Sequence, residues 1–180
     1  MNWYELGPFT IFDIETTGMS PVRDRIVELA AVRVDLDGSQ KNFSSLLNPG
    51  CSIPPRASSV HHITDDMVKN APFFGDIAED FLNFIEGSKL VAHNATFDLS
   101  FIQESLVRDG FSPWKGETYD SLKIARDVYP DKNSHNLQDL RKTLGLTSTP
   151  GMNPHRAAAD VEWTRQLLAI MLTAMINARK

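Results

Sequence analysis

The chain has 180 residues, of which 42% are hydrophobic and 23% are charged, and these values are ordinary for a folded globular protein. Its formal net charge of -5 at pH 7 argues against a broad electrostatic grip on duplex nucleic acid, although it leaves open the binding of one strand end through metal ions. The single cysteine, Cys51, excludes an internal disulfide and fits a reducing compartment. We expect one domain over residues 1–180.

No segment has the pattern of a secretory signal or a membrane span. The first nine residues carry no basic region, and the longest apolar segment, residues 167–176, is about half the length that a bilayer requires. We therefore expect a cytoplasmic protein that has no membrane partner.

The first part of the chain predicts an antiparallel meander. The apolar run that begins at Phe9 is typical of a buried strand, and residues 26–35 and 41–47 predict two more. Asp37-Gly38 is typical of the hairpin turn that would join the second and third strands. The glycine and three prolines of residues 48–59 predict a loop, after which Thr64 could cap a short helix.

The rest of the chain alternates helical and extended segments. Hydrophobic spacing predicts helices over residues 76–86, 95–110, 121–128, 137–144 and 155–178, with extended segments at 89–92 and 114–120 and a loop at 148–154. Three antiparallel strands followed by this alternation predict a mixed α/β domain, with a five-stranded sheet and helices on both faces.

Two carboxylates follow the first predicted strand. Asp13 and Glu15 are alternate residues of the stretch FTIFDIETTG, so their side chains would point to the same side of the strand. Neighbouring buried carboxylates raise each other's pKa unless a cation neutralises them, and a hard divalent metal is the simplest solution. A D-x-E triplet by itself often marks a solvated strand end, so the preceding apolar run is what favours a functional site.

Two more aspartates occupy inward positions on predicted helices. Asp98 belongs to the apolar stripe of helix 95–110, and Asp160 lies within the stripe of helix 155–178. Either residue alone could be a boundary residue that makes a capping bond or an ion pair. The small residues 157–159 would let the last helix approach the sheet and bring Asp160 towards the first two carboxylates.

His155 precedes Asp160 by five residues, a spacing that does not place two side chains on one face of a helix. The two residues therefore cannot form an i, i+4 metal pair. With Asn153 as a cap and Pro154 in the first turn, His155 would lie at or just before the helix start. Because imidazole exchanges a proton near neutral pH, a mobile base is favoured over a solvated loop histidine.

Three motifs follow one another along the chain: DIETTG at 13–18, HNATFD at 93–98 and HRAAAD at 155–160. They closely resemble the three exonuclease motifs of the DEDDh family, in the branch typified by the epsilon subunit of bacterial DNA polymerase III, with ribonuclease T as a more distant relative. The segments VHHIT at 60–64 and NLQDLRKTLGL at 136–146 also resemble that branch. The resemblance extends over nearly the whole chain.

The resemblance implies a ribonuclease H-like fold and hydrolysis of single-stranded DNA or RNA from the 3′ end, with release of nucleoside 5′-monophosphates. It implies that two Mg²⁺ or Mn²⁺ ions are held by Asp13, Glu15, Asp98 and Asp160, and that His155 is the general base. No other cofactor is implied. The residues implied to contact the terminal nucleotide are Thr16, Gly18, Met19, His61, Asn94 and Phe97.

Two departures from the family pattern affect these expectations. His62 replaces a glycine, so its side chain could narrow the end-binding pocket. The chain ends soon after Asp160, without the long tail by which epsilon binds its polymerase, so a DNA polymerase subunit is a weaker expectation than a stand-alone trimming exonuclease. An RNA-trimming enzyme of ribonuclease T type, a domain with a purely structural metal and an inactive module that binds nucleic-acid ends are the alternatives. The inactive module is disfavoured because no carboxylate or histidine is missing.

Basic residues cluster in the sequence before the third motif, and they could guide phosphates or simply form a solvated helix face. The solvated face is the favoured interpretation. These residues are Lys123, Arg126, Lys132, Arg141 and Lys142.

Overall fold

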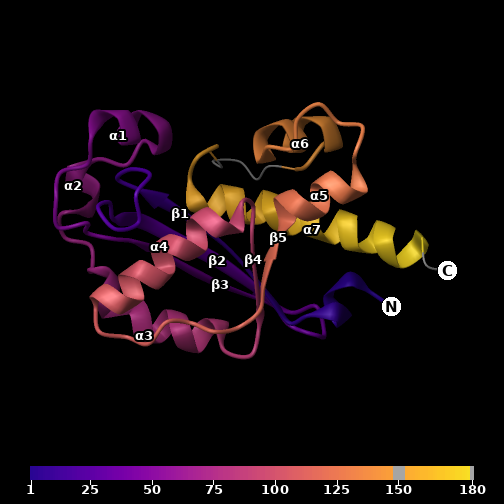
Figure 1. Ribbon diagram of the computed structural model, residues 1–180, viewed down its shortest axis with the longest axis horizontal. Helices are drawn as coiled ribbons and strands as arrows, with labels where there is room; N and C mark the ends of the chain where they lie inside the picture. The colour runs from indigo at the N-terminus through magenta and orange to yellow at the C-terminus, as the bar shows by residue number, and fades with distance from the viewer. Residues whose placement is uncertain (148–152, 179–180) are drawn as a thin grey trace.

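The computed structural model describes residues 1–147 and 153–178 of the protein and contains a five-stranded sheet in the order β3-β2-β1-β4-β5 (Figure 1). The strands are β1 (Phe9–Thr16), β2 (Ile26–Val34), β3 (Gln40–Leu46), β4 (Lys89–Ala92) and β5 (Thr118–Asp120). Strand β2 pairs antiparallel with both β1 and β3, whereas β4 pairs parallel with β1 and β5. The mixed α/β fold predicted from the sequence is therefore confirmed.

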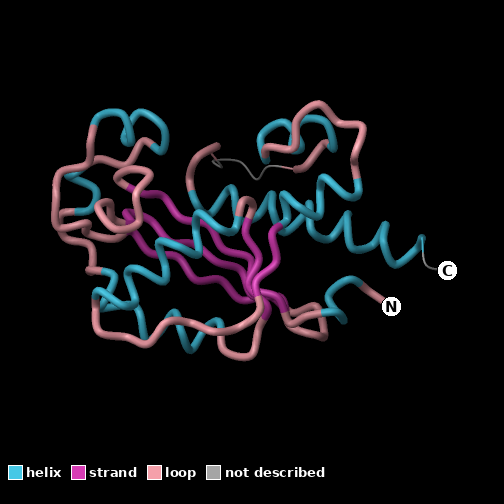
Figure 2. The backbone as a smooth tube through the Cα atoms, in the orientation of Figure 1, coloured by secondary structure: helices cyan, strands magenta, loops and turns pink. Residues whose placement is uncertain are grey.

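Helices cover both faces of this sheet (Figure 2). They are η1 (Trp3–Leu6), α1 (Pro55–His61), α2 (Asp65–Val68), α3 (Phe74–Ile85), α4 (Ala95–Arg108), α5 (Ser121–Val128), α6 (Leu137–Leu144) and α7 (Ala157–Ala178). Helices α3 and α4 pack on one face and α7 packs on the other, with α5 and α6 against the outer side of α7. Within the described residues, no helix combines the length and the apolarity that crossing a bilayer requires.

The alternation of side chains along β1 places the carboxylates of the first motif. Phe9 and Ile11 belong to the core beneath α7, while Phe12 belongs to the core beneath α3 and α4. Continuing the same two-residue period puts Asp13 and Glu15 on the α7 face, beyond the end of its apolar core. The fold thus delivers both carboxylates to the N-terminal end of α7.

Several predicted boundaries differ from those of the structure, and two of the differences have a clear physical cause. Residues 48–59 do not form only a loop, because Pro55 starts α1; proline fits the first position of a helix, where its missing N–H is not needed. The last helix starts at Ala157 rather than at residue 155, because His155 has a φ of 60° and so lies in the left-handed region. Of the predicted loop 148–154, residues 148–152 lie outside the described part of the chain.

Candidate active site

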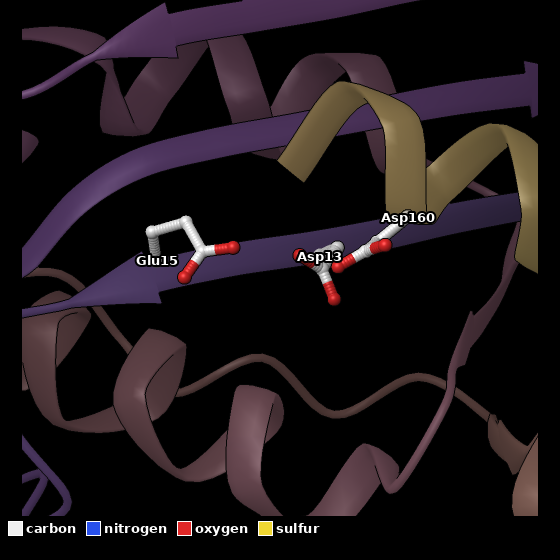
Figure 3. Close-up of side chains that lie close together, drawn as sticks. All are labelled: Asp13, Glu15 and Asp160. Atoms are coloured by element: carbon white, nitrogen blue, oxygen red, sulfur yellow. The ribbon is translucent and has the colours of Figure 1, made fainter. Parts of the chain in front are cut away.

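Three acidic side chains from two distant parts of the sequence meet at the end of β1. One oxygen from each of Asp13, Glu15 and Asp160 can be chosen so that all three lie within 4.8 Å of one another. The first two come from β1, and Asp160 reaches them from the first turn of α7, as Figure 3 shows. Within the described residues, none of the three makes a salt bridge with lysine or arginine.

The surroundings of these carboxylates favour their protonated forms. Burial, followed by the charges of Asp98 and Asp160, raises the pKa of Asp13 well above its usual value. Burial and neighbouring carboxylates raise the pKa of Glu15 to about 9. The pKa of Asp160 rises only to about 6, because His155 and a hydrogen bond from Gln138 partly offset its burial. A divalent cation bound among these oxygens would supply the missing positive charge.

Asp98 reaches the same region from the other side of β1. It is only 4% exposed and lies in the first turn of α4. Beyond the Ile11–Val91 pair the edge of β1 is free of β4, and the Oδ1 atom of Asp98 accepts a hydrogen bond of 3.3 Å from the Ile14 N–H. Burial raises the pKa of Asp98 to about 8. Asp98 thus lies beside the cluster without joining the group of three oxygens.

His155 lines a cavity together with Asp13 and Asp160 of the cluster. This cavity has a volume of about 440 Å³, and its walls include Asp13, Asp160, Gln138 and His155. The Nε2 atom of Gln138 donates a hydrogen bond of 3.0 Å to Oδ1 of Asp160, which fixes that carboxylate between α6 and α7. The imidazole is exposed and lies in the turn just before α7, the place expected for a base that exchanges protons with solvent.

A partly buried ion pair, which was not predicted from the sequence, fixes the start of α7. Glu28 on β2 has a side chain only 5% exposed, and it pairs with Arg156 at Oε1–Nη2 2.7 Å and Oε2–Nε 3.0 Å. The Ala157 N–H donates a further bond of 2.9 Å to Oε2 of Glu28, which satisfies a free amide of the first helical turn. The signal in the sequence was a glutamate at a buried position of a mostly apolar strand.

All six residues expected to contact a terminal nucleotide line one cavity of about 520 Å³ beside Glu15. Its walls also include Arg56 and Val60 of α1, a helix that was not predicted from the sequence. Met19 is 78% exposed at one side, whereas Phe97 is half-buried and packs on Phe101 with a ring-centroid distance of 5.0 Å. The cavity has the size range of small-molecule sites.

Internal hydrogen bonds hold the wall of this cavity in place. His61 is 2% exposed, accepts the Ile63 N–H on Nδ1 at 3.0 Å and, with its proton on Nε2, donates to the Thr16 carbonyl at 3.2 Å. A Cβ atom added to Gly18 would lie 2.5 Å from Oδ2 of Asp24, an oxygen that accepts the Ser20 N–H. A side chain at position 18 would therefore displace the loop.

His62 does not narrow this cavity, contrary to the expectation from the sequence. It is exposed, is absent from the cavity lining and ends α1 with a φ of 60°. A residue that ends a helix in the left-handed region is usually glycine. What is special about position 62 is therefore its backbone conformation and not a contact with the cavity.

Comparison with known proteins gives a consistent family assignment. The model of the exonuclease family matches residues 10–168. The DNA polymerase III subunit epsilon of Treponema pallidum is 40% identical over 171 residues, which cover 94% of this chain and 78% of the relative. The PolC-type DNA polymerase III of Oceanobacillus iheyensis is 38% identical over 176 residues, but this match spans only 12% of that much longer protein.

Solved structures agree with this assignment. Exonuclease X in complex with 5′ overhanging duplex DNA is similar, with a TM-score of 0.72, 33% identity and 92% coverage of both chains. Escherichia coli exonuclease I in complex with a dT13 oligonucleotide shares the fold, with a TM-score of 0.82 at 21% identity, over 94% of this chain and 42% of that one. The chain therefore belongs to the exonuclease family and is homologous to the epsilon subunit of DNA polymerase III.

Proposed function

We propose that residues 1–180 act as a single 3′ to 5′ exonuclease domain of DEDDh type, which removes nucleoside 5′-monophosphates from single-stranded 3′ ends. The observation that carries this proposal is the cluster of Asp13, Glu15 and Asp160, which has no lysine or arginine partner among the described residues. Two of its members, Asp13 and Asp160, line the same cavity as His155. A structural ion pair would have its own arginine, as Glu28 does. A carboxylate cluster left without one suits a bound cation.

The metal set that we propose is two Mg²⁺ or Mn²⁺ ions, held by Asp13, Glu15, Asp160 and the adjoining Asp98. The donor chemistry fits, because carboxylate oxygens are the ligands that these hard cations accept. Burial raises the pKa values of Glu15, Asp98 and Asp160, and a bound cation would favour their charged forms. When bound, such ions supply positive charge to the phosphoryl and leaving oxygens and lower the pKa of water.

The proton of the attacking water goes to His155 in this proposal. An unprotonated imidazole nitrogen accepts it, and the exposed position of the ring lets the proton pass on to solvent. Gln138 holds Oδ1 of Asp160, which leaves the other oxygen of that carboxylate for a cation. The Glu28–Arg156 pair fixes the backbone at the start of α7, the segment that carries His155 and Asp160.

The cavity beside Glu15 would hold the terminal nucleoside. Phe97 and Met19 offer apolar surface to a base, and Thr16, His61 and Asn94 line other parts of the cavity. The DNA complexes of exonuclease X and exonuclease I support a strand end as the ligand. The 40% identity to an epsilon subunit supports DNA and a proofreading or repair role, with a DNA polymerase as the partner.

Digestion of labelled oligonucleotides tests this function. With Mg²⁺ or Mn²⁺, a 5′-labelled single strand should shorten one nucleotide at a time, and a 3′ label should leave as a mononucleotide in the first step. Asp160→Ala or excess chelator should abolish both reactions. Matched DNA and RNA strands, with paired and unpaired 3′ ends, separate proofreading from RNA trimming. Full activity in Asp160→Ala protein, or release of the 5′ label first, would refute the proposal.

A further inference from the structure

A third cavity, of about 520 Å³, adjoins both cavities of the candidate site. It shares His93 and Asn136 with the cavity of His155, and it shares Asn94 with the cavity assigned to the terminal nucleoside. The remainder of its wall includes Arg126 of α5 and the polar residues 133–135. A strand whose 3′ end occupies the nucleoside cavity would therefore find a polar recess next to the hydrolytic centre.

The wall that this recess shares with the candidate site is held by hydrogen bonds. The His93 ring bridges two segments, with Nδ1 2.9 Å from the Ser121 hydroxyl and Nε2 2.8 Å from the carbonyl of His135. Asn136 caps α6, because its Oδ1 accepts the Asp139 N–H at 2.8 Å. The recess is thus formed before any ligand arrives, which lowers the cost of binding.

Arg126 supplies the positive charge of this recess. Within the described residues its guanidinium makes no hydrogen bond or salt bridge, unlike Arg156 and Arg165, which each pair with a glutamate. Asp120, the acidic residue at the start of α5, already accepts the N–H groups of Asn94 and Leu122 on Oδ1. Arg126 is therefore free to bind an external anion, and guanidinium matches the geometry of phosphate.

We propose that this recess binds the internucleotide phosphate next to the scissile one on its 5′ side, with Arg126 as the charged contact. This inference rests on the proposed exonuclease function and adds a second phosphate subsite to it. It also assigns different roles to two of the basic residues before the third motif. Arg126 lines the recess, whereas Lys123, one turn earlier on the same exposed helix surface, does not.

Two substrates of different length test the subsite. The p-nitrophenyl ester of thymidine 5′-monophosphate offers a single phosphate, whereas a single-stranded tetranucleotide also offers the phosphate assigned to Arg126. Arg126→Ala should raise KM for the tetranucleotide by about five-fold or more, because it removes one charge-assisted contact. The effect should be confined to the substrate that carries this phosphate, and Lys123→Ala is the matched control with wild-type behaviour. A methylphosphonate at that linkage should reduce the difference between wild type and Arg126→Ala.

Binding measured without turnover keeps the test independent of catalysis. Fluorescence anisotropy of a labelled single strand in Ca²⁺ should show weaker binding by Arg126→Ala, with a slope of log K against log salt that is smaller by about 0.7. Equal KM, affinity and salt slope for Arg126→Ala and Lys123→Ala would overturn the subsite, even in an active enzyme. Absence of wild-type hydrolysis on both substrates would instead overturn the proposed function, and the anisotropy result would then decide the phosphate site alone.

Discussion

Glu15 and Glu28 lie directly opposite each other on β1 and β2, yet the charged groups that surround the two carboxylates differ. Glu28 receives the guanidinium of Arg156 and the N–H of Ala157. Glu15 has no salt bridge within the described part of the chain, and it shares its surroundings with Asp13 and Asp160. Its pKa is raised to about 9.

The difference separates a structural carboxylate from a functional one. Two glutamates on one face of a sheet could both be paired, since the chain supplies an arginine at the start of α7. Leaving three carboxylates without such a partner costs stability in the metal-free protein, and bound protons or a bound cation offset this cost. The group that neutralises a carboxylate therefore distinguishes the two roles. An arginine neutralises the structural Glu28, whereas a bound cation would neutralise the candidate catalytic cluster.

The largest effect is expected from a change within the cluster. Asp13→Asn keeps the size of the side chain and removes a charged ligand, so exonuclease activity should fall by roughly 10³-fold or more. Far-ultraviolet circular dichroism should remain that of the wild type. Asp66→Asn, on an exposed aspartate of α2, is the control and should leave the rate unchanged. Near-normal turnover by Asp13→Asn would remove this residue from the catalytic machinery.

A smaller loss is expected when the base is removed and the cluster is kept. His155→Ala should lower kcat by about 10²- to 10⁴-fold, because water then loses its positioned proton acceptor. Mn²⁺ affinity should stay within a few-fold of wild type, since the imidazole is not proposed as a ligand. Measurements of kcat and of Mn²⁺ binding on one protein sample check both statements. Loss of Mn²⁺ binding would make His155 a ligand instead of a base.

Breaking the Glu28–Arg156 ion pair should affect the stability of the protein more than its exonuclease activity. Glu28→Gln removes the charge that Arg156 and the start of α7 require, so the free energy of unfolding should fall by roughly 1–3 kcal/mol. Activity should fall by about ten-fold, because the start of α7, which carries His155 and Asp160, would then be held less firmly. Urea unfolding and steady-state rates provide the two readouts. A loss of activity as complete as that of Asp13→Asn, with unchanged stability, would place Glu28 among the functional carboxylates.

The smallest effect is expected in the pH dependence of the stability of the metal-free protein. The pKa values of Glu15 and Asp98, about 9 and about 8, lie above their usual values of 4.5 and 3.8. The folded protein therefore binds protons more tightly than the unfolded chain, and stability should fall as the pH rises from about 5 to about 9. Glu15→Gln should flatten this decline and raise the Tm in chelator at about pH 8.5 by roughly 5 °C. A wild-type Tm that rises over this range would contradict the pKa shifts.

Much of the fold was predictable because its signals are local. Strand β4 and helices α5 and α6 have the predicted bounds. The two helices combine clear hydrophobic spacing with a capping residue at the start, and α6 also has a glycine at its end. The inward positions of Asp98 and Asp160 were likewise predicted from helical periodicity, and both side chains are buried.

The features that could not be predicted depend on distant contacts or on backbone geometry. Glu28 and Arg156 are separated by 128 positions in the sequence, so no local pattern reveals that they pair. The start of α7 is set by that contact and by the left-handed backbone of His155. Pro54 and Pro55 indicated a loop, although Pro55 occupies the first position of α1.

Calorimetric titration of the metal-free protein with Mn²⁺ tests the central claim most directly, with wild type, Glu15→Gln and Glu28→Gln compared in buffers of different ionisation enthalpy. We expect wild type to bind Mn²⁺ and release protons, Glu15→Gln to lose most of this affinity, and Glu28→Gln to retain it. Equal Mn²⁺ binding by wild type and Glu15→Gln, or no binding by wild type, would contradict the assignment of the unpaired carboxylates as the metal site.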